Sequence, residues 1–481
     1  MSLQQQVQQL ILSNFPHDPT QGQLEACEAL VDFLYDPDPN VAFLLKGYAG
    51  TGKTSLIGAL IKTAPLIRIK TVLLAPTGRA AKVLANYSGK KTYTIHKKIY
   101  TTLTDSSGMM HVVRAQNKHR YTLFIVDEAS MIGTGSTEEG DFGRRNLLED
   151  LIEYVGEGYH CRLLFMGDTA QLPPVNAAES PALDSNYLES ISSLHLHEYE
   201  LTEVVRQQLE SGILRNATSL REKIAQLSDY DDIELPIFDL KHCPDLKRLP
   251  GEDLEEVLNQ EYGQNDLESI AIVCRSNKRA NLFNQSIRNR ILFKEESINA
   301  GDYLMVVKNN YFWLDNESEI GFIANGDIIE ILSARNFQEL YGFHFADATI
   351  RFVDYPDAPT LDCKLLLETL YSESPSLTRE ESRKLFNTVM EDYADLPTKA
   401  ERMMELQKNP YFNALQIKFS YALTCHKTQG GQWKTIVIDQ GYLTDEMLNK
   451  EYLRWLYTAL TRATEKVYLL GFEEKFFEEQ Q

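Results

Sequence analysis

Apolar runs rich in β-branched residues recur along this 481-residue chain, each followed by a polar loop and then by apolar positions at helical spacing. Buried strands of a parallel sheet give such continuous runs, and their alternation with helices is typical of α/β domains. The first half of the chain carries runs at 41–45, 71–75, 123–126 and 161–166. A second set lies at 270–274, 435–438 and 466–470. The pattern predicts two α/β domains, each built on a parallel sheet.

Two stretches interrupt this alternation. Residues 88–120 are polar, basic and rich in turn signals, which predicts a small hairpin inserted in the first domain. Residues 301–411 begin with two strand patterns that flank Ala324-Asn325-Gly326, as in a small β-barrel, and continue with a capping box of Thr378 and Glu381 before a helix. We therefore expect a first domain from 1–87 and 121–215, a second from 216–300 and 412–481, and inserts at 88–120 and 301–411.

The stretch Gly47-Tyr48-Ala49-Gly50-Thr51-Gly52-Lys53-Thr54 directly follows the run at 41–45 and matches G-x-x-x-x-G-K-[ST]. Its glycines let the backbone turn tightly, so that N–H groups and the N-terminus of the next helix point at phosphate oxygens. Lys53 would reach the β- and γ-phosphates, and the Thr54 hydroxyl would bind Mg²⁺. The alternative is a chance match in a glycine-rich turn, which the order of strand, loop and helix disfavours.

Asp127 and Glu128 stand at the end of the run at 123–126. Adjacent carboxylates at the carboxyl end of a strand suit a metal–phosphate site, with Asp127 holding Mg²⁺ and Glu128 polarising the attacking water. Taken alone, the pair is more simply an acidic turn. The loop at Lys53 favours the metal–phosphate interpretation.

Other polar groups suit a base and a polynucleotide. The Gln23 amide could satisfy both hydrogen-bond functions of an adenine edge, although a lone glutamine is more simply a surface residue. The stretch Pro76-Thr77-Gly78-Arg79 and, after it, His96 offer hydroxyl, guanidinium and imidazole groups that suit a phosphate backbone.

Three more residues could act on a terminal phosphate. Gln171 could hydrogen-bond both the γ-phosphate and the attacking water, and Arg206 and Arg462 are candidate arginine fingers. Either arginine alone is more simply a member of a solvated ion pair. Cys425-His426 is disfavoured as a metal pair because no further ligands flank it.

Composition narrows the choice of partners. A net charge of −21 argues against a broad basic face, so any polyanion site must be confined. The six cysteines are far apart with no C-x-x-C pair, which indicates neither a disulfide framework nor a zinc site. The N-terminus does not resemble a signal peptide, and no apolar run approaches the ~20 residues that span a bilayer. We expect a soluble, cytoplasmic protein without a membrane partner.

The motifs GYAGTGKTS, APTGRAA, TIH, VDEASM, GDTAQLPPV, TCHKTQGG and YTALTRA occur in the order of the superfamily-one helicase motifs. The chain most resembles the RecD/Dda-like branch, from about residue 20 to residue 470. The resemblance implies an ATP-dependent DNA helicase with two RecA-like motor domains, ATP and Mg²⁺ between them, single-stranded DNA across both, and 5′→3′ movement into duplex junctions. The hairpin would be a strand-splitting pin, and the second insert an SH3-like barrel with a helical extension. A monomer with a role in DNA repair or recombination is also implied.

The resemblance assigns roles to single residues. Hydrolysis would rest on Lys53, Thr54, Asp127, Glu128, Gln171, Arg206 and Arg462. The nucleotide would also contact Gln23, Gly47, Ala49, Gly50, Thr51, Gly52, Ser55 and Gly431. The DNA path would be lined by Pro76, Thr77, Arg79, His96, Asn325, Thr424 and His426. Many relatives have an acidic residue where Gln432 stands, which leaves nucleotide discrimination open. The chain resembles the minimal Dda-like motor rather than the RecD-type members with a long N-terminal extension.

Other functions stay open. The same motifs could drive a translocase that remodels protein–nucleic acid complexes or acts on RNA. A nucleotide-dependent switch could bind DNA without moving along it, but a switch would not need Glu128, Gln171 and two finger arginines together.

Overall fold

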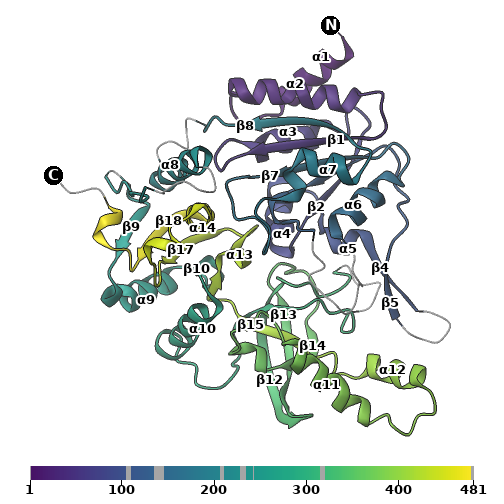
Figure 1. The fold of residues 1–481 in the computed structure, drawn as a ribbon, viewed down its shortest axis with the longest axis vertical. Coiled ribbons are helices and arrows are strands. Elements are labelled where there is room, and N and C mark those ends of the chain that lie inside the picture. Colours follow the sequence, from purple (N-terminus) through teal and green to yellow (C-terminus); the bar gives the residue numbers. More distant parts are fainter. Residues whose placement is uncertain are drawn as a thin grey trace.

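The computed structural model describes residues 2–104, 110–134, 146–205, 211–227, 234–241, 243–314 and 320–477. Within these ranges the framework consists of two parallel sheets, a closed β-barrel and a two-stranded hairpin (Figure 1). The predicted α/β class with two parallel-sheet domains is confirmed.

The first sheet belongs to the N-terminal part of the chain and has the strand order β3-β2-β6-β7-β1-β8, with parallel pairing throughout. Its strands are β1 (Val41–Gly47), β2 (Lys70–Ala75), β3 (Thr92–Thr94), β6 (Thr122–Val126), β7 (Arg162–Gly167) and β8 (His195–Leu201). Its helices are α1 (Leu3–Ser13), α2 (Gln21–Tyr35), α3 (Lys53–Thr63), α4 (Gly78–Ser88), α5 (Ile95–Ile99), α6 (Leu147–Gly156) and α7 (Ser185–Ile191). Successive side chains of β1 point to opposite faces of the sheet and pack in two different cores. Phe43 and Leu45 pack with α1 to α3, whereas Ala42 and Leu44 pack with α6 and α7.

The second sheet has the order β16-β10-β17-β18-β9, again parallel. Its strands are β9 (Leu246–Leu249), β10 (Ile270–Cys274), β16 (Ala422–Thr424), β17 (Trp433–Asp439) and β18 (Ala463–Leu470). Its helices are α8 (Gly212–Gln226), α9 (Leu254–Gln264), α10 (Asn277–Ser286), α13 (Cys425–Thr428) and α14 (Lys450–Leu460). Helix α14 packs on α8 in a core with Ile436 and Leu469, and its carboxyl end faces the first sheet.

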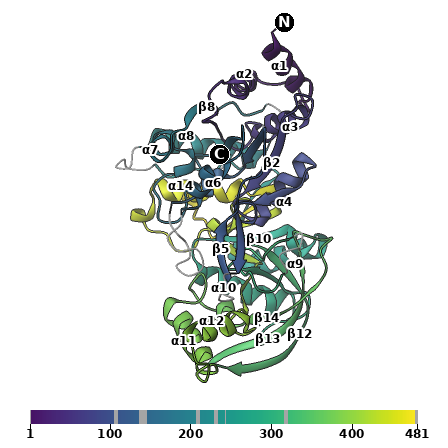
Figure 2. The same ribbon diagram turned by 90° about the vertical axis from the view of Figure 1, so that its right-hand side faces the viewer.

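The barrel closes in the order β11-β12-β13-β14-β15. Its strands are β11 (Tyr303–Val306), β12 (Ile328–Leu340), β13 (Phe343–Phe352), β14 (Leu361–Leu366) and β15 (Leu415–Phe419). Helices α11 (Arg379–Glu391) and α12 (Lys399–Lys408) form the extension, and α11 begins with the predicted capping box of Thr378 and Glu381. Figure 2 shows the barrel below the two sheets.

The hairpin consists of β4 (Tyr100–Thr104) and β5 (Met110–Arg114), and it projects from the first sheet toward α11 and α12 (Figure 1). Two boundaries differ from the expected ones. Residues 92–94 pair with β2 as a short polar edge strand, so the hairpin begins at Tyr100 rather than near residue 88. Residues 415–419 close the barrel, so the second domain resumes at β16 rather than at residue 412.

The cysteines are buried and free, as expected from their spacing. Among the described residues, no helix combines the length and the apolar character that crossing a bilayer requires.

Candidate nucleotide site and nucleic-acid interface

The loop between β1 and α3 has the cradle conformation that its glycines predict. Gly50 and Gly52 adopt φ angles of 78° and 83°, in the left-handed region. A Cβ on Gly52 would lie 2.2 Å from Gln23 Nε2, so a larger residue would have to displace the Gln23 amide. Helix α3 begins at Lys53 and directs its N-terminal N–H groups at the loop, which makes an anion site.

Lys53 lies along this loop. Its Nζ donates to the Tyr48 carbonyl oxygen at 2.9 Å and also to that of Gly47. Thr54 and Ser55 follow in the first turn of α3 and are partly exposed. The ammonium group is therefore already held at the mouth of the cradle.

Gln23 is hydrogen-bonded to the backbone of the same loop. Its side chain is fully buried: Nε2 donates to the Thr51 carbonyl at 3.0 Å, and Oε1 accepts from the Thr20 N–H at 3.1 Å. The simple reading of Gln23 as a surface residue is wrong. The residue expected at the adenine is thus seated against the loop backbone.

Asp127 and Glu128 lie where β6 ends, beside the cradle. Asp127 Oδ1 accepts from the Glu128 N–H at 2.7 Å, and Glu128 has a left-handed φ of 52°. Burial, and then the charge of Glu128, raise the pKa of Asp127 to about 7, against the opposing charges of Lys53 and Arg462. Two adjacent, partly buried carboxylates offer the oxygen ligands that a hard divalent cation such as Mg²⁺ prefers.

Arg462 approaches these carboxylates from the second domain. Its Nη1 lies 3.8 Å from Glu128 Oε1, and its side chain is 6% exposed. Nε donates to the Thr458 carbonyl at 3.1 Å, and Nη1 lies 3.5 Å from the Gly431 carbonyl oxygen. The structure therefore brings Lys53, Asp127, Glu128 and Arg462 together. The second candidate finger, Arg206, lies outside the described residues.

Gln171 is buried, and its Oε1 has no hydrogen-bond partner among the described residues. The backbone of the next residue, Leu172, is hydrogen-bonded to the second domain. Thr458 Oγ1 accepts from the Leu172 N–H at 2.9 Å, and Gln429 Nε2 donates to the Leu172 carbonyl at 2.6 Å. A buried carboxamide oxygen without a partner can accept a hydrogen bond from water, as the predicted role requires.

Tyr457 joins the second domain to the cradle, a contact that sequence reasoning missed. Its buried hydroxyl donates to Asp168 Oδ2 at 2.6 Å and accepts from the Ala49 N–H of the cradle at 2.8 Å. In sequence, Tyr457 opens the motif YTALTRA, but its helical spacing is that of a core residue, and only the candidate finger Arg462 was singled out there.

The predicted DNA contacts of the first domain meet the second domain at α4. Thr77 caps α4 through the Ala80 N–H at 3.2 Å, and the Arg79 guanidinium stacks 3.9 Å above the Trp433 ring. A Cβ on Gly430, which has a φ of 72°, would lie 2.6 Å from Ala80 Cβ. Thr77 and Arg79 therefore lie at the junction of the two sheets.

The barrel reaches the same place. Thr77 lies 3.9 Å from the Cβ position of Gly326, next to the exposed Asn325. We define the barrel seat as Gly78, Lys97, Asp327 and Tyr355. In it, Lys97 Nζ lies 3.4 Å from Asp327 Oδ2 and 3.2 Å from the Tyr355 hydroxyl, and a Cβ on Gly78 would meet Asp327 Oδ1 at 2.3 Å.

The remaining predicted DNA contacts lie near strand ends. Pro76 follows β2, Thr424 ends β16, and both are partly exposed. Burial lowers the pKa of His96 to about 4 and lowers that of His426. Both imidazoles are therefore neutral at pH 7 and can hydrogen-bond a nucleic acid without adding charge.

Comparison with known proteins agrees with this architecture. Residues 19–234 match a family model described as an AAA domain, and residues 419–470 match one described as a UvrD-like helicase C-terminal domain. The chain is 24% identical to the ATP-dependent RecD2 DNA helicase of Deinococcus radiodurans, over 89% of this chain and 46% of that protein. It is 25% identical to the ATP-dependent DNA helicase dda of Enterobacteria phage T4, over 66% of this chain and 68% of that one. The chain thus spans less than half the length of the RecD2 protein.

Among solved structures, a Pif1 helicase from Bacteroides in complex with ADP-AlF3 and ssDNA is similar, with a TM-score of 0.48 and 15% identity over 96% of this chain and 95% of that one. The two family matches fall on the first and second parallel sheets, and the motif residues from both sheets converge on one cradle. In its two family matches and its helicase relatives, the chain is similar to superfamily-one helicases of the RecD/Dda-like branch.

Proposed function

We propose that this protein is an ATP-dependent DNA helicase that couples ATP hydrolysis to 5′→3′ translocation on single-stranded DNA and to unwinding at duplex junctions. One observation carries the proposal: Arg462 of the second domain lies 3.8 Å from Glu128 of the first, beside the cradle. A nucleotide in this cradle would be contacted from both halves of the molecule. The names and activities of the helicase relatives support the choice of ATP and DNA, and the direction rests on the resemblance alone.

The residues would divide the hydrolytic work. Lys53 and the N–H groups of the cradle would bind the phosphates, and Thr54 with Asp127 would hold Mg²⁺, which neutralises phosphate charge when bound. Glu128 and the Gln171 oxygen would orient the attacking water. Arg462, together with Arg206, would stabilise charge on the γ-phosphate as the bond to the β-phosphate breaks.

Closure of the cleft would drive movement. The γ-phosphate can close the cleft only if the nucleotide binds the closed arrangement more tightly than the open one. Contact with Arg462 would supply this difference in affinity. Thr77, Arg79 and Asn325 would hold one part of the strand, and Thr424 and His426 the other. Because both halves of the site lie in one chain, the proposed motor is a monomer. The six free thiols suit the reducing cytoplasm.

The test is an unwinding and ATPase assay on duplexes with 5′ or 3′ overhangs, made of DNA or RNA. We expect DNA-stimulated ATP turnover and unwinding of DNA with a 5′ overhang, and Lys53→Ala should abolish both while the protein stays folded. Activity on RNA alone, or turnover that displaces bound proteins without unwinding, would support the remodelling alternative. Unchanged turnover in Lys53→Ala would remove the proposal.

A further inference from the structure

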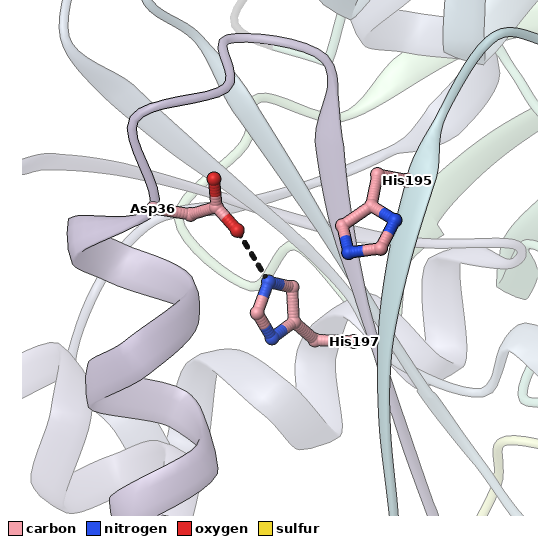
Figure 3. A group of neighbouring side chains, drawn as sticks. All are labelled: Asp36, His195 and His197. Atoms are coloured by element: carbon pink, nitrogen blue, oxygen red, sulfur yellow. Dashed lines mark hydrogen bonds and ion pairs between the residues drawn. The ribbon is translucent and has the colours of Figure 1, made fainter.

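Two histidines and a carboxylate form a cluster on the first domain. His195 and His197 stand two residues apart on β8, an edge strand, so both side chains are on the same face of the sheet. Asp36 caps the carboxyl end of α2, and its Oδ2 lies 2.8 Å from His197 Nε2 (Figure 3). One ligand atom from each of the three residues lies within 4.8 Å of the other two.

The cluster is separate from the nucleotide site. Strand β8 runs parallel to β1, with His195 opposite Val41 and Leu201 opposite Gly47. The cradle follows Gly47, whereas His195 is level with the start of β1. Six residue steps along a parallel strand separate them by about 20 Å.

We propose that Asp36, His195 and His197 bind a divalent transition-metal ion of the Zn²⁺, Ni²⁺ or Cu²⁺ class. Two imidazoles and one carboxylate are a donor set that these ions prefer, whereas Mg²⁺ and Ca²⁺ prefer oxygen alone. Metal–ligand bonds of about 2.0 Å in a tetrahedral site place two ligand atoms about 3.3 Å apart. The Asp36–His197 distance is only a few tenths of an ångström shorter, and the exposed His195 ring can turn to complete the set.

The residues around the cluster are aromatic rings and one arginine. The His195 and His197 rings lie 5.5 Å apart at 78°, and the Phe33 ring packs edge-on against His197 at 6.0 Å. Arg162 is the neighbouring cation that opposes metal binding, but its guanidinium donates to the backbone oxygens of Phe33 and Asp36. Because one arginine opposes the metal and solvent reaches His195, we expect a dissociation constant on the order of micromolar.

A bound ion would join the end of α2 to the start of β8. These two segments are distant in sequence, and β8 is one of the two edge strands of the described sheet. Because only the folded chain brings the three ligands together, metal binding would raise the melting temperature in proportion to occupancy.

The experiment is titration calorimetry of the full chain, freed of metal with EDTA, using ZnCl₂, NiCl₂ and CuCl₂ in excess MgCl₂ to cover the carboxylates at the nucleotide site. One ion should bind per chain. His195→Gln and His197→Gln should each weaken binding by about tenfold or more. The matched control is His344→Gln, an exposed strand histidine whose Nδ1 lies 2.9 Å from Glu368, and it should leave binding unchanged. Electron paramagnetic resonance of the Cu²⁺ form should show coupling to imidazole nitrogens that His195→Gln reduces.

No binding near one ion per chain, or binding of equal strength in His195→Gln and His197→Gln, would overturn the proposal and leave Asp36–His197 as a plain ion pair. His195→Gln should keep wild-type DNA-stimulated ATP turnover. The metal proposal and the helicase proposal can therefore fail independently.

Discussion

The Tyr457 hydroxyl donates to the Asp168 carboxylate at 2.6 Å, and the same oxygen accepts the Ala49 N–H at 2.8 Å. One phenol thus joins the segment after β7, the phosphate cradle and α14. Arg462 lies five residues further along the chain, just beyond the end of α14. The position of the arginine at Glu128 and the hydrogen bonds of the tyrosine are therefore parts of one contact between the domains.

Tyr457→Phe should keep the ring in its core and remove both hydrogen bonds. Asp168 would retain the Ala170 N–H at 2.9 Å, so the fold should survive. We expect the kcat of DNA-stimulated ATP turnover to fall about tenfold, equivalent to about 1.4 kcal/mol, with a smaller change in KM. Tyr452→Phe is the control, since its hydroxyl accepts from Gln440 at 3.4 Å within the second domain. Equal effects in both variants would contradict a role for the contact in turnover.

Arg462→Ala should retain ATP binding and lose hydrolysis. The cradle and Lys53 would still hold the phosphates, but the charge next to Glu128 would be missing, and such arginines contribute about 10³-fold or more in rate. Fluorescent-nucleotide titration and steady-state turnover measure the two properties separately. Weak nucleotide binding combined with normal turnover is the result that would refute this assignment.

Mg²⁺ binding should depend on pH through Asp127. Its pKa is raised from 3.8 to about 7, so the folded chain binds an extra proton between these values, and the contribution of Asp127 to stability declines as pH rises toward 7. Mg²⁺ requires the ionised carboxylate, so its affinity should rise with pH and level off above 7. At pH 6 the affinity should be about tenfold below its value at pH 8. Calorimetry checks this, and Asp127→Asn should flatten the profile; an equally steep profile in that variant would place the titration elsewhere.

Lys97→Met should remove the ion pair with Asp327 in the barrel seat. The side chains of Lys97 and Asp327 are 7% and 1% exposed, so the substitution leaves a buried carboxylate unpaired, which costs about 3–5 kcal/mol. The pKa of Asp327 is already raised by burial, with Lys97 opposing the rise. We expect a lower melting temperature, largely restored in Lys97→Met/Asp327→Leu. A single variant as stable as the wild type would show that the ion pair does not hold the barrel.

Shortening the hairpin should impair unwinding more than translocation. Its base is fixed to α6 by Tyr100 on Asp150 at 2.6 Å and by Arg114 on Glu157 at 2.8 Å, while His111 and Val112 line a cavity of about 550 Å³ with α11 and α12. Replacing residues 103–111 with a short glycine turn keeps this base. Strand separation and stopped-flow translocation on single strands are the two measurements, and equal losses in both would argue against a pin.

The sequence predicted what depends on local pattern. The cradle at 47–54, the carboxylates after β6 and the capping box of α11 each combine a motif with its own secondary structure, and all were found in place. Strand β8 was not predicted because an edge strand reading HLHEYEL has no continuous apolar run. Tyr457 and the assignment of β15 to the barrel depend on pairing between distant segments, which periodicity along the chain does not carry.

The barrel seat has a mechanical consequence. In sequence, the barrel is an insert within the second domain. Its Asp327 nevertheless contacts Gly78 and Lys97 of the first domain. As long as this seat holds, any hinge motion of the motor must be absorbed in the short segments that flank β11 and β15. A strand bound beside Thr77 would then stay next to the barrel while the two sheets move.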